Sequence, residues 1–72
     1  MNAESETIMG ITVNADRIKV YEKPSEFSEV VCEIKKDTFL LIDEKDSTDD
    51  FYSICTETGI MGFCMKMFVE LK

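Results

Sequence analysis

Apolar and polar residues alternate with a period of two along most of this chain. Ile18 and Val20 alternate with charged neighbours, and the same spacing recurs at Val30, Cys32 and Ile34. Successive side chains of a strand point to opposite faces, so the alternation predicts strands that each bury one face. Strands are expected over residues 11–20, 30–34, 38–42, 51–56, 60–65 and 69–71.

Breaks in the pattern predict where the strands bend and end. The phase of the alternation slips by one residue between Ala15 and Ile18, which predicts a bend or bulge near Asp16. Pro24 has no N–H to donate to a neighbouring strand, so the first strand ends before it and a loop follows over residues 22–28.

Turns and one short helix complete the predicted elements. Residues 35–37 form a tight turn ending at Asp37, and Thr58–Gly59 is expected to close a hairpin. Residues 66–68 are expected to form one helical turn before the last strand. No amphipathic helix of useful length is predicted, so the chain is expected to be all-β.

The length favours one small barrel. With 72 residues the chain is one domain that buries about 60% of the surface its unfolded form exposes. Short, closely spaced strands favour a small five- to six-stranded barrel, because closing a sheet removes its exposed edges. We expect residues 1–10 to be a flexible N-terminal segment and residues 11–72 to form the barrel.

The charge of the chain excludes some partners. Fifteen acidic residues against eight basic ones give a net charge of −7. Nucleic acid and anionic membranes are therefore not expected as partners, whereas a basic protein surface would be attracted. The start of the chain has neither a basic segment nor an apolar run, so no secretory signal is expected and the predicted location is cytoplasmic.

Catalytic and metal chemistry find little support in the residue types. The chain has no His and no Cys-x-x-Cys motif, so neither a zinc site nor a base for a thiol nucleophile is expected. The acidic stretch 43–50 lacks the Gly and spacing of a calcium loop and is predicted to be a solvated loop. We therefore predict a protein without enzymatic activity, metal or cofactor.

The three cysteines are predicted to be free thiols that act as small hydrophobes, with a redox or metal role as the alternative. Pairing outward from Thr58–Gly59 would place Cys55 opposite Gly62, so Cys64 would be a diagonal neighbour of Cys55. Diagonal neighbours lie ~7–8 Å apart, which is too far for a disulfide without backbone movement.

Five short motifs in order resemble the bacterial Src-homology-three-like domain family. They are "KVYEKPS", "SEVVCEI", "KKDT", "FY" and "GFC", and the match covers residues 11–71. The chain departs from the family pattern at Asp37, where the family has Gly, and at Phe51 and Phe63, where it has Trp. The resemblance implies a small barrel that binds cell-wall peptides or protein partners.

The resemblance also implies a ligand groove. It places Tyr21 and Phe27 on or beside the first long loop, and Phe51 and Phe63 at groove-lining positions. Aromatic grooves of this kind take extended or proline-rich peptides. The alternative is that these rings fill the core of the barrel.

A second surface is predicted from the third strand. The resemblance places Leu40 and Ile42 at inward positions, so Phe39 and Leu41 are expected to point outward. The family has polar residues at the positions of three methionines near the C-terminus, Met61, Met65 and Met67. An exposed apolar patch of these five residues would mark an interface. The alternative is that the N-terminal segment covers it.

Three functions remain open at this point. The favoured one is a non-enzymatic module that binds a protein or peptide, with self-association as one form of that role. The second is a module that binds the bacterial cell wall. The third is a small acidic inhibitor or nucleic-acid mimic of the phage type, suggested by charge and size.

Overall fold

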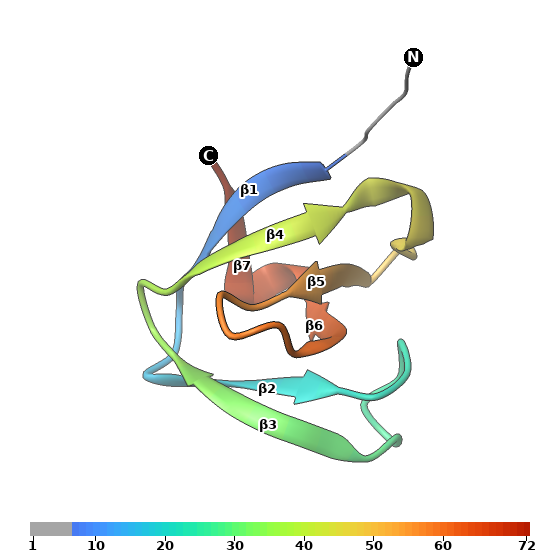
Figure 1. The fold of residues 1–72 in the computed structure, drawn as a ribbon. Helices are drawn as coiled ribbons and strands as arrows, with labels where there is room; N and C mark the ends of the chain where they lie inside the picture. Colours follow the sequence, from blue (N-terminus) through green and yellow to red (C-terminus); the bar gives the residue numbers. More distant parts are fainter. Residues whose placement is uncertain (1–6) are drawn as a thin grey trace.

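The structure, a computed structural model that describes residues 7–72, consists of strands and two single turns of 3-10 helix (Figure 1). The strands are β1 (Thr7–Thr12), β2 (Arg17–Tyr21), β3 (Val30–Lys35), β4 (Phe39–Asp43), β5 (Phe51–Cys55), β6 (Met61–Met65) and β7 (Val69–Leu71). The 3-10 turns are η1 (Glu44–Asp46) and η2 (Lys66–Phe68). The all-β prediction is confirmed, and η2 occupies the residues at which one helical turn was expected. No helix within residues 7–72 is long and apolar enough to span a membrane.

The seven strands form one antiparallel sheet in the order β3-β2-β6-β5-β4-β1-β7. The sheet is not closed, so the prediction of a five- to six-stranded barrel was wrong. The sheet curls, however, and the β2–β3 hairpin lies across from β1 and β4 (Figure 1). The hairpin joins the other five strands through a single residue pair, Tyr21 with Phe63, so the sheet is narrowest there.

The first expected strand is in fact two strands. Asn14 has a left-handed backbone with φ of 73°, and the turn around it separates β1 from β2. An Asn tolerates this conformation better than most residues, which explains the phase slip without a bulge. Within β1 the buried positions are Gly10 and Thr12, so Ile11 lies on the other face, contrary to the apolar alternation.

The sheet also begins earlier than expected. β1 starts at Thr7 and pairs with β4 from that residue onward. Residues 7–10 are therefore part of the sheet and not of a flexible segment, while residues 1–6 lie outside the described residues. The reason is the continuous pairing of Thr7–Gly10 with residues 40–43.

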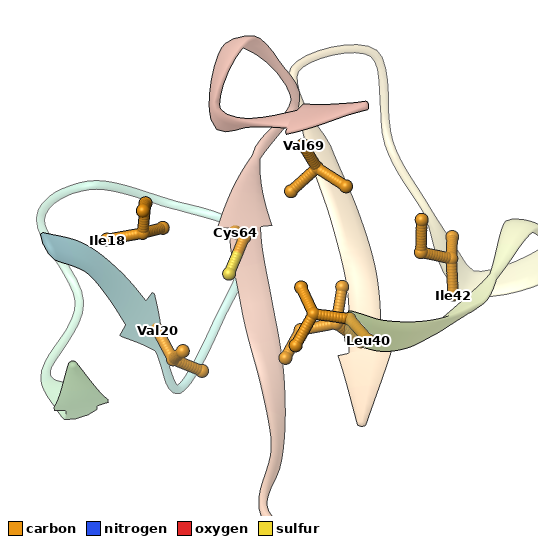
Figure 2. Close-up of a cluster of buried hydrophobic side chains, with 7 residues drawn as sticks. Ile18, Val20, Leu40, Ile42, Cys64 and Val69 are labelled. Carbon is orange, nitrogen blue, oxygen red and sulfur yellow. The ribbon is translucent and has the colours of Figure 1, made fainter. Parts of the chain in front are cut away.

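One apolar core lies on the inner side of the curled sheet. Figure 2 shows side chains from β2, β4, β6 and β7 pointing toward one another. The buried cluster comprises Ile18, Val20, Leu40, Ile42, Ile54, Cys64 and Val69. Leu40 and Ile42 point inward, as predicted. Full burial of each large aliphatic side chain stabilises the fold by about 1.5–3 kcal/mol, so this cluster supplies most of the driving force.

A buried hydroxyl ties β1 to the turn after β3. The Thr12 hydroxyl donates to the backbone oxygen of Lys35 over 2.7 Å and accepts from the backbone N–H of Thr38 over 2.8 Å. The backbone N–H of Asp37 donates to the backbone oxygen of Thr12 over 2.8 Å. Asp37 adopts φ of 64°, as expected for a tight turn. Thr12 is therefore a polar core residue with a structural task.

A close approach of β2 and β6 requires a glycine. A Cβ atom on Gly62 would lie 2.5 Å from the Val20 Cγ1 and 2.7 Å from the backbone oxygen of Tyr21. Neither distance is compatible with a side chain at this position. Gly62 thus permits the one crossing that attaches the β2–β3 hairpin to the rest of the sheet.

The β5–β6 hairpin has a longer loop than the predicted Thr58–Gly59 turn. The backbone oxygen of Thr56 accepts from the N–H of Gly59 over 3.0 Å. The backbone N–H of Thr56 donates to the backbone oxygen of Ile60 over 2.9 Å. Cys55 consequently lies opposite Met61 and not Gly62. This one-residue difference in register puts Cys55 on the outer face and leaves Cys64 buried in the core. All three cysteines are free.

Candidate interaction surfaces

Four exposed or half-buried side chains form a continuous row across the outer face of the sheet. The register aligns Met9 with Leu41, Leu41 with Cys55, and Cys55 with Met61, on β1, β4, β5 and β6. Met9 and Leu41 are each 47% exposed, and Met61 is 73% exposed. We call these four residues the apolar row. Phe39, 43% exposed, lies beside it on β4.

Two depressions flank Leu41 along this row. One, of about 190 Å³, includes Leu41, Cys55 and Met61 in its lining. The other, of about 270 Å³, includes Met9, Phe39 and Leu41. Both also include Cys55. The outer face is therefore indented where its apolar side chains stand.

The rim of these depressions is acidic. Asp43 and Asp46 line the first depression, and Glu57 lines the second. Among the described lining residues, these three are the charged ones. An apolar surface edged with carboxylates favours a ligand that combines apolar side chains with cations.

The local sequence explains why this face is apolar. β4 reads Phe-Leu-Leu-Ile-Asp, so it carries apolar side chains on both faces. Leu40 and Ile42 supply the core, which leaves Phe39 and Leu41 for the outer face. A sheet with one solvated face ordinarily alternates apolar and polar residues, so the apolar outer positions indicate an interaction surface.

The structure brings together only part of the predicted patch. Phe39, Leu41 and Met61 lie together as expected, whereas Met65 and Met67 lie at the far end of β6 and in η2. Met9 and Cys55 were missed, because their membership depends on the register of four strands. The sequence signal that could have identified Met9 is the pair of apolar residues at alternate positions, Met9 and Ile11. The alternative was that the N-terminal segment 1–10 covers the patch; Met9 of that segment belongs to the row itself, and residues 1–6 lie outside the described residues.

Three of the four predicted groove aromatics gather near the opposite end of β6. The rings of Tyr21 and Phe51 meet edge to face, with centroids 6.0 Å apart and an interplanar angle of 85°. Phe63 lies directly opposite Tyr21 in the sheet. Tyr21 and Phe51 are only 8% and 7% exposed, so these two rings also act as core, which was the stated alternative.

Phe27 does not join these aromatics. The loop after Pro24 is held by the Ser28 hydroxyl, which donates to the backbone oxygen of Ser25 over 2.9 Å and accepts from the N–H of Lys23 over 3.2 Å. Phe27 extends from this loop and is 92% exposed. The loop is ordered by its own hydrogen bonds, and it presents Phe27 to solvent instead of carrying it over Phe51.

The aromatic end carries two further depressions that share Met65. The first, of about 240 Å³, is lined by Arg17, Ile18, Lys19, Tyr21, Met65 and Phe68. The second, of about 250 Å³, is lined by Glu26, Asp49, Asp50, Phe51, Met65, Lys66 and Met67. We call the two together the Met65 groove. Met65 and Met67, expected beside Phe39, belong here.

The pKa values of two of the three thiols lie above the ordinary value. Burial, and to a smaller extent the nearby Cys32, raises the pKa of Cys64 to about 12. Burial also raises the pKa of Cys32. A thiol with a raised pKa is a poor nucleophile at neutral pH. Within residues 7–72, no group of three or more Cys, Asp or Glu side chains is placed to hold a metal ion.

Comparison with protein-family models, curated proteins and solved structures found no match to this chain. The interpretation of both surfaces therefore rests on their own geometry and charge.

Proposed function

We propose that this protein is a non-enzymatic binding module that recognises a protein partner through the apolar row. The observation that carries the proposal is the alignment of Met9, Leu41, Cys55 and Met61 across four neighbouring strands. Burying such side chains against a partner gains about 25 cal/mol per Å² of apolar surface. Met9 and Leu41 are about half exposed, so they add less to the fold than the buried core side chains do.

The rim of the row defines the chemistry of the partner. Asp43, Asp46 and Glu57 favour a partner that places Lys or Arg around a few apolar side chains. A second copy of the chain would bring the same carboxylates together, and the net charge of −7 adds to that repulsion. A basic partner is therefore favoured over self-association.

The resemblance to the bacterial Src-homology-three-like family supports the same role. "KVYEKPS" runs from β2 into a loop, "KKDT" spans the β3–β4 turn, and "GFC" lies within β6. We accordingly propose a distant membership of that family, in which the sheet is open and the binding face is apolar.

A selection from a random peptide library tests the proposal. The purified protein is immobilised, and bound peptides are sequenced and remeasured by fluorescence anisotropy. The expected consensus contains two or three apolar residues and at least two Lys or Arg. Leu41→Asp should weaken the selected peptides at least about tenfold, because the loss of one buried Leu contact is worth ~1.5–3 kcal/mol.

Val31→Asp is the matched control, since Val31 is 45% exposed on β3 and lies outside both row depressions. It changes charge and apolarity as Leu41→Asp does, and it should leave peptide binding unchanged. Selection of acidic peptides, or equal weakening by both variants, would contradict the proposal. Light scattering and peptidoglycan pull-down on the same samples test self-association and wall binding.

A further inference from the structure

The Met65 groove is polarised along its length. Its two depressions adjoin at Met65, and the ring contact between Tyr21 and Phe51 joins their walls. One depression carries cations and the other carries mainly carboxylates. Apolar surface therefore lies between charges of opposite sign.

The cationic end is formed by Arg17 and Lys19 on β2. Lys35 lies opposite Arg17 on β3 and adds positive charge, while Glu33 lies opposite Lys19. Within residues 7–72, neither Arg17 nor Lys19 forms an ion pair or a side-chain hydrogen bond. The guanidinium of Arg17 carries five donors in a fixed fork, and a carboxylate fits that fork in two-point contact.

The acidic end is formed by Glu26, Asp49 and Asp50. Lys66 lies at the same end, and its ammonium nitrogen stands 5.0 Å from the centre of the Tyr52 ring. Three carboxylates against one cation leave this end negative. A Lys or Arg side chain of a ligand is therefore favoured here, with its stem against Met67 or Phe51.

We propose that the Met65 groove binds an extended peptide segment that carries a carboxylate and a cation on either side of an apolar side chain. The carboxylate lies against Arg17 and Lys19, the apolar side chain against Tyr21 and Met65, and the cation against Asp49 and Asp50. This site lies on residues outside the apolar row, so it can be tested independently of the proposed function.

The size and charge of the groove select a peptide over other ligands. Each depression measures about 240–250 Å³, below the ~300–1,000 Å³ of usual small-molecule pockets, and suits one side chain. Two adjoining side-chain sites match an extended backbone, which places neighbouring residues at intervals of ~3.3 Å. Nucleic acid and anionic lipid are disfavoured, because the acidic end would repel phosphate.

A set of synthetic peptides with blocked termini tests the proposal. The bipolar probes contain one Glu and one Lys separated by two to four apolar residues, in both orders. The comparison probes carry Glu at both positions, Lys at both positions, or Gln at both. Titration followed by amide nuclear magnetic resonance shifts should show the tightest binding for one bipolar order, with shifts at Arg17, Lys19, Met65 and Asp50.

Charge reversal of the cationic end provides the decisive variant. Arg17→Glu with Lys19→Glu should weaken the bipolar peptide about twofold to thirtyfold, as expected for two exposed ion pairs, and should make the Lys–Lys peptide the preferred one. The double variant Lys36→Glu with Lys72→Glu has the same net charge and should keep the original preference. If the charge-reversed variant is unstable, the double variant Arg17→Gln with Lys19→Gln replaces it, because it removes the two cations without adding negative charge.

Three results would overturn the proposal. These are equal affinity of bipolar and Gln probes, no detectable binding of any probe, and shifts confined to Leu41 and its neighbours. The last result would leave the proposed function intact while removing this site. Loss of peptide selection by Leu41→Asp with unchanged probe binding would support both surfaces as separate sites.

Discussion

Neighbouring leucines on opposite faces of β4 provide a matched pair for testing the fold and the exposed row together. Leu40 is 2% exposed and packs in the core, whereas Leu41 is 47% exposed on the outer face. Leu40→Ala and Leu41→Ala delete the same atoms one residue apart. Their difference in stability therefore reports which face each side chain occupies.

The magnitudes follow from burial. Leu40→Ala removes a fully buried side chain and leaves a cavity, at a cost of ~2–5 kcal/mol. Leu41→Ala removes a side chain that is only about half buried, so it should cost about 1 kcal/mol or less. The whole domain is expected to be stable by ~4–11 kcal/mol from its length, so the first substitution removes a large share.

Urea unfolding followed by circular dichroism measures both variants, because the chain has no Trp for fluorescence. Leu41→Ala should keep nearly the wild-type midpoint, and Leu40→Ala should lose much of it or fail to fold. In the latter case Leu40→Val gives a smaller, measurable loss. Comparable losses for Leu40→Ala and Leu41→Ala would refute the placement of Leu41 on the surface and with it the apolar row.

Three further substitutions test particular contacts. Gly62→Ala should destabilise the fold by ~1–3 kcal/mol in urea unfolding, because its Cβ would meet the backbone oxygen of Tyr21; a neutral result would contradict the close crossing. Thr12→Val should cost ~1–3 kcal/mol, because the Thr12 hydroxyl would no longer pair with the backbone oxygen of Lys35 and the backbone N–H of Thr38; Thr12→Ser should cost less. Burial holds the pKa of Cys64 near 12 in the folded state, above its ordinary value of 9.0, so only the unfolded state loses its proton between those pH values. The free energy of unfolding should therefore be intact below pH 9 and fall by up to ~1.4 kcal/mol per pH unit above it, and Cys64→Ala should show a shallower decline; equal slopes would contradict this.

Local patterns in the sequence predicted the individual strands well. In β4 both the inward pair Leu40 and Ile42 and the outward pair Phe39 and Leu41 are confirmed. The turn at Asp37, which adopts a left-handed backbone, and the single helical turn at residues 66–68 were also predicted from local sequence. The turn and the single helical turn depend on neighbouring residues alone, whereas the inward positions of Leu40 and Ile42 were taken from the family resemblance.

The features that depend on distant residues were not predictable in the same way. The left-handed Asn14 divided one expected strand into two, and Thr12 was buried because its hydroxyl reaches partners 23 and 26 residues away. The open sheet follows from which strands pair, a choice that the period of a strand does not encode. The loop before Met61 shifted the register by one residue and moved Cys55 to the outer face.

The same distinction applies to the candidate surfaces. Phe39 and Leu41 were predicted correctly as an exposed pair, but the row they belong to exists only across β1, β4, β5 and β6. Met65 was expected in that patch and instead lies between two charged depressions. Neither grouping could be obtained without the strand order.

Protection of Cys55 from alkylation tests the central claim most directly, because this thiol lines both depressions of the apolar row. The protein is treated with N-ethylmaleimide with and without a saturating selected basic peptide, and modification of each cysteine is followed by mass spectrometry of proteolytic fragments. Cys32, which lies on β3 away from the row, is the internal reference in the same molecule. A ligand bound on the row should slow alkylation of Cys55 strongly and leave the rate at Cys32 unchanged, whereas equal rates at Cys55 with and without bound peptide would contradict the proposed binding face.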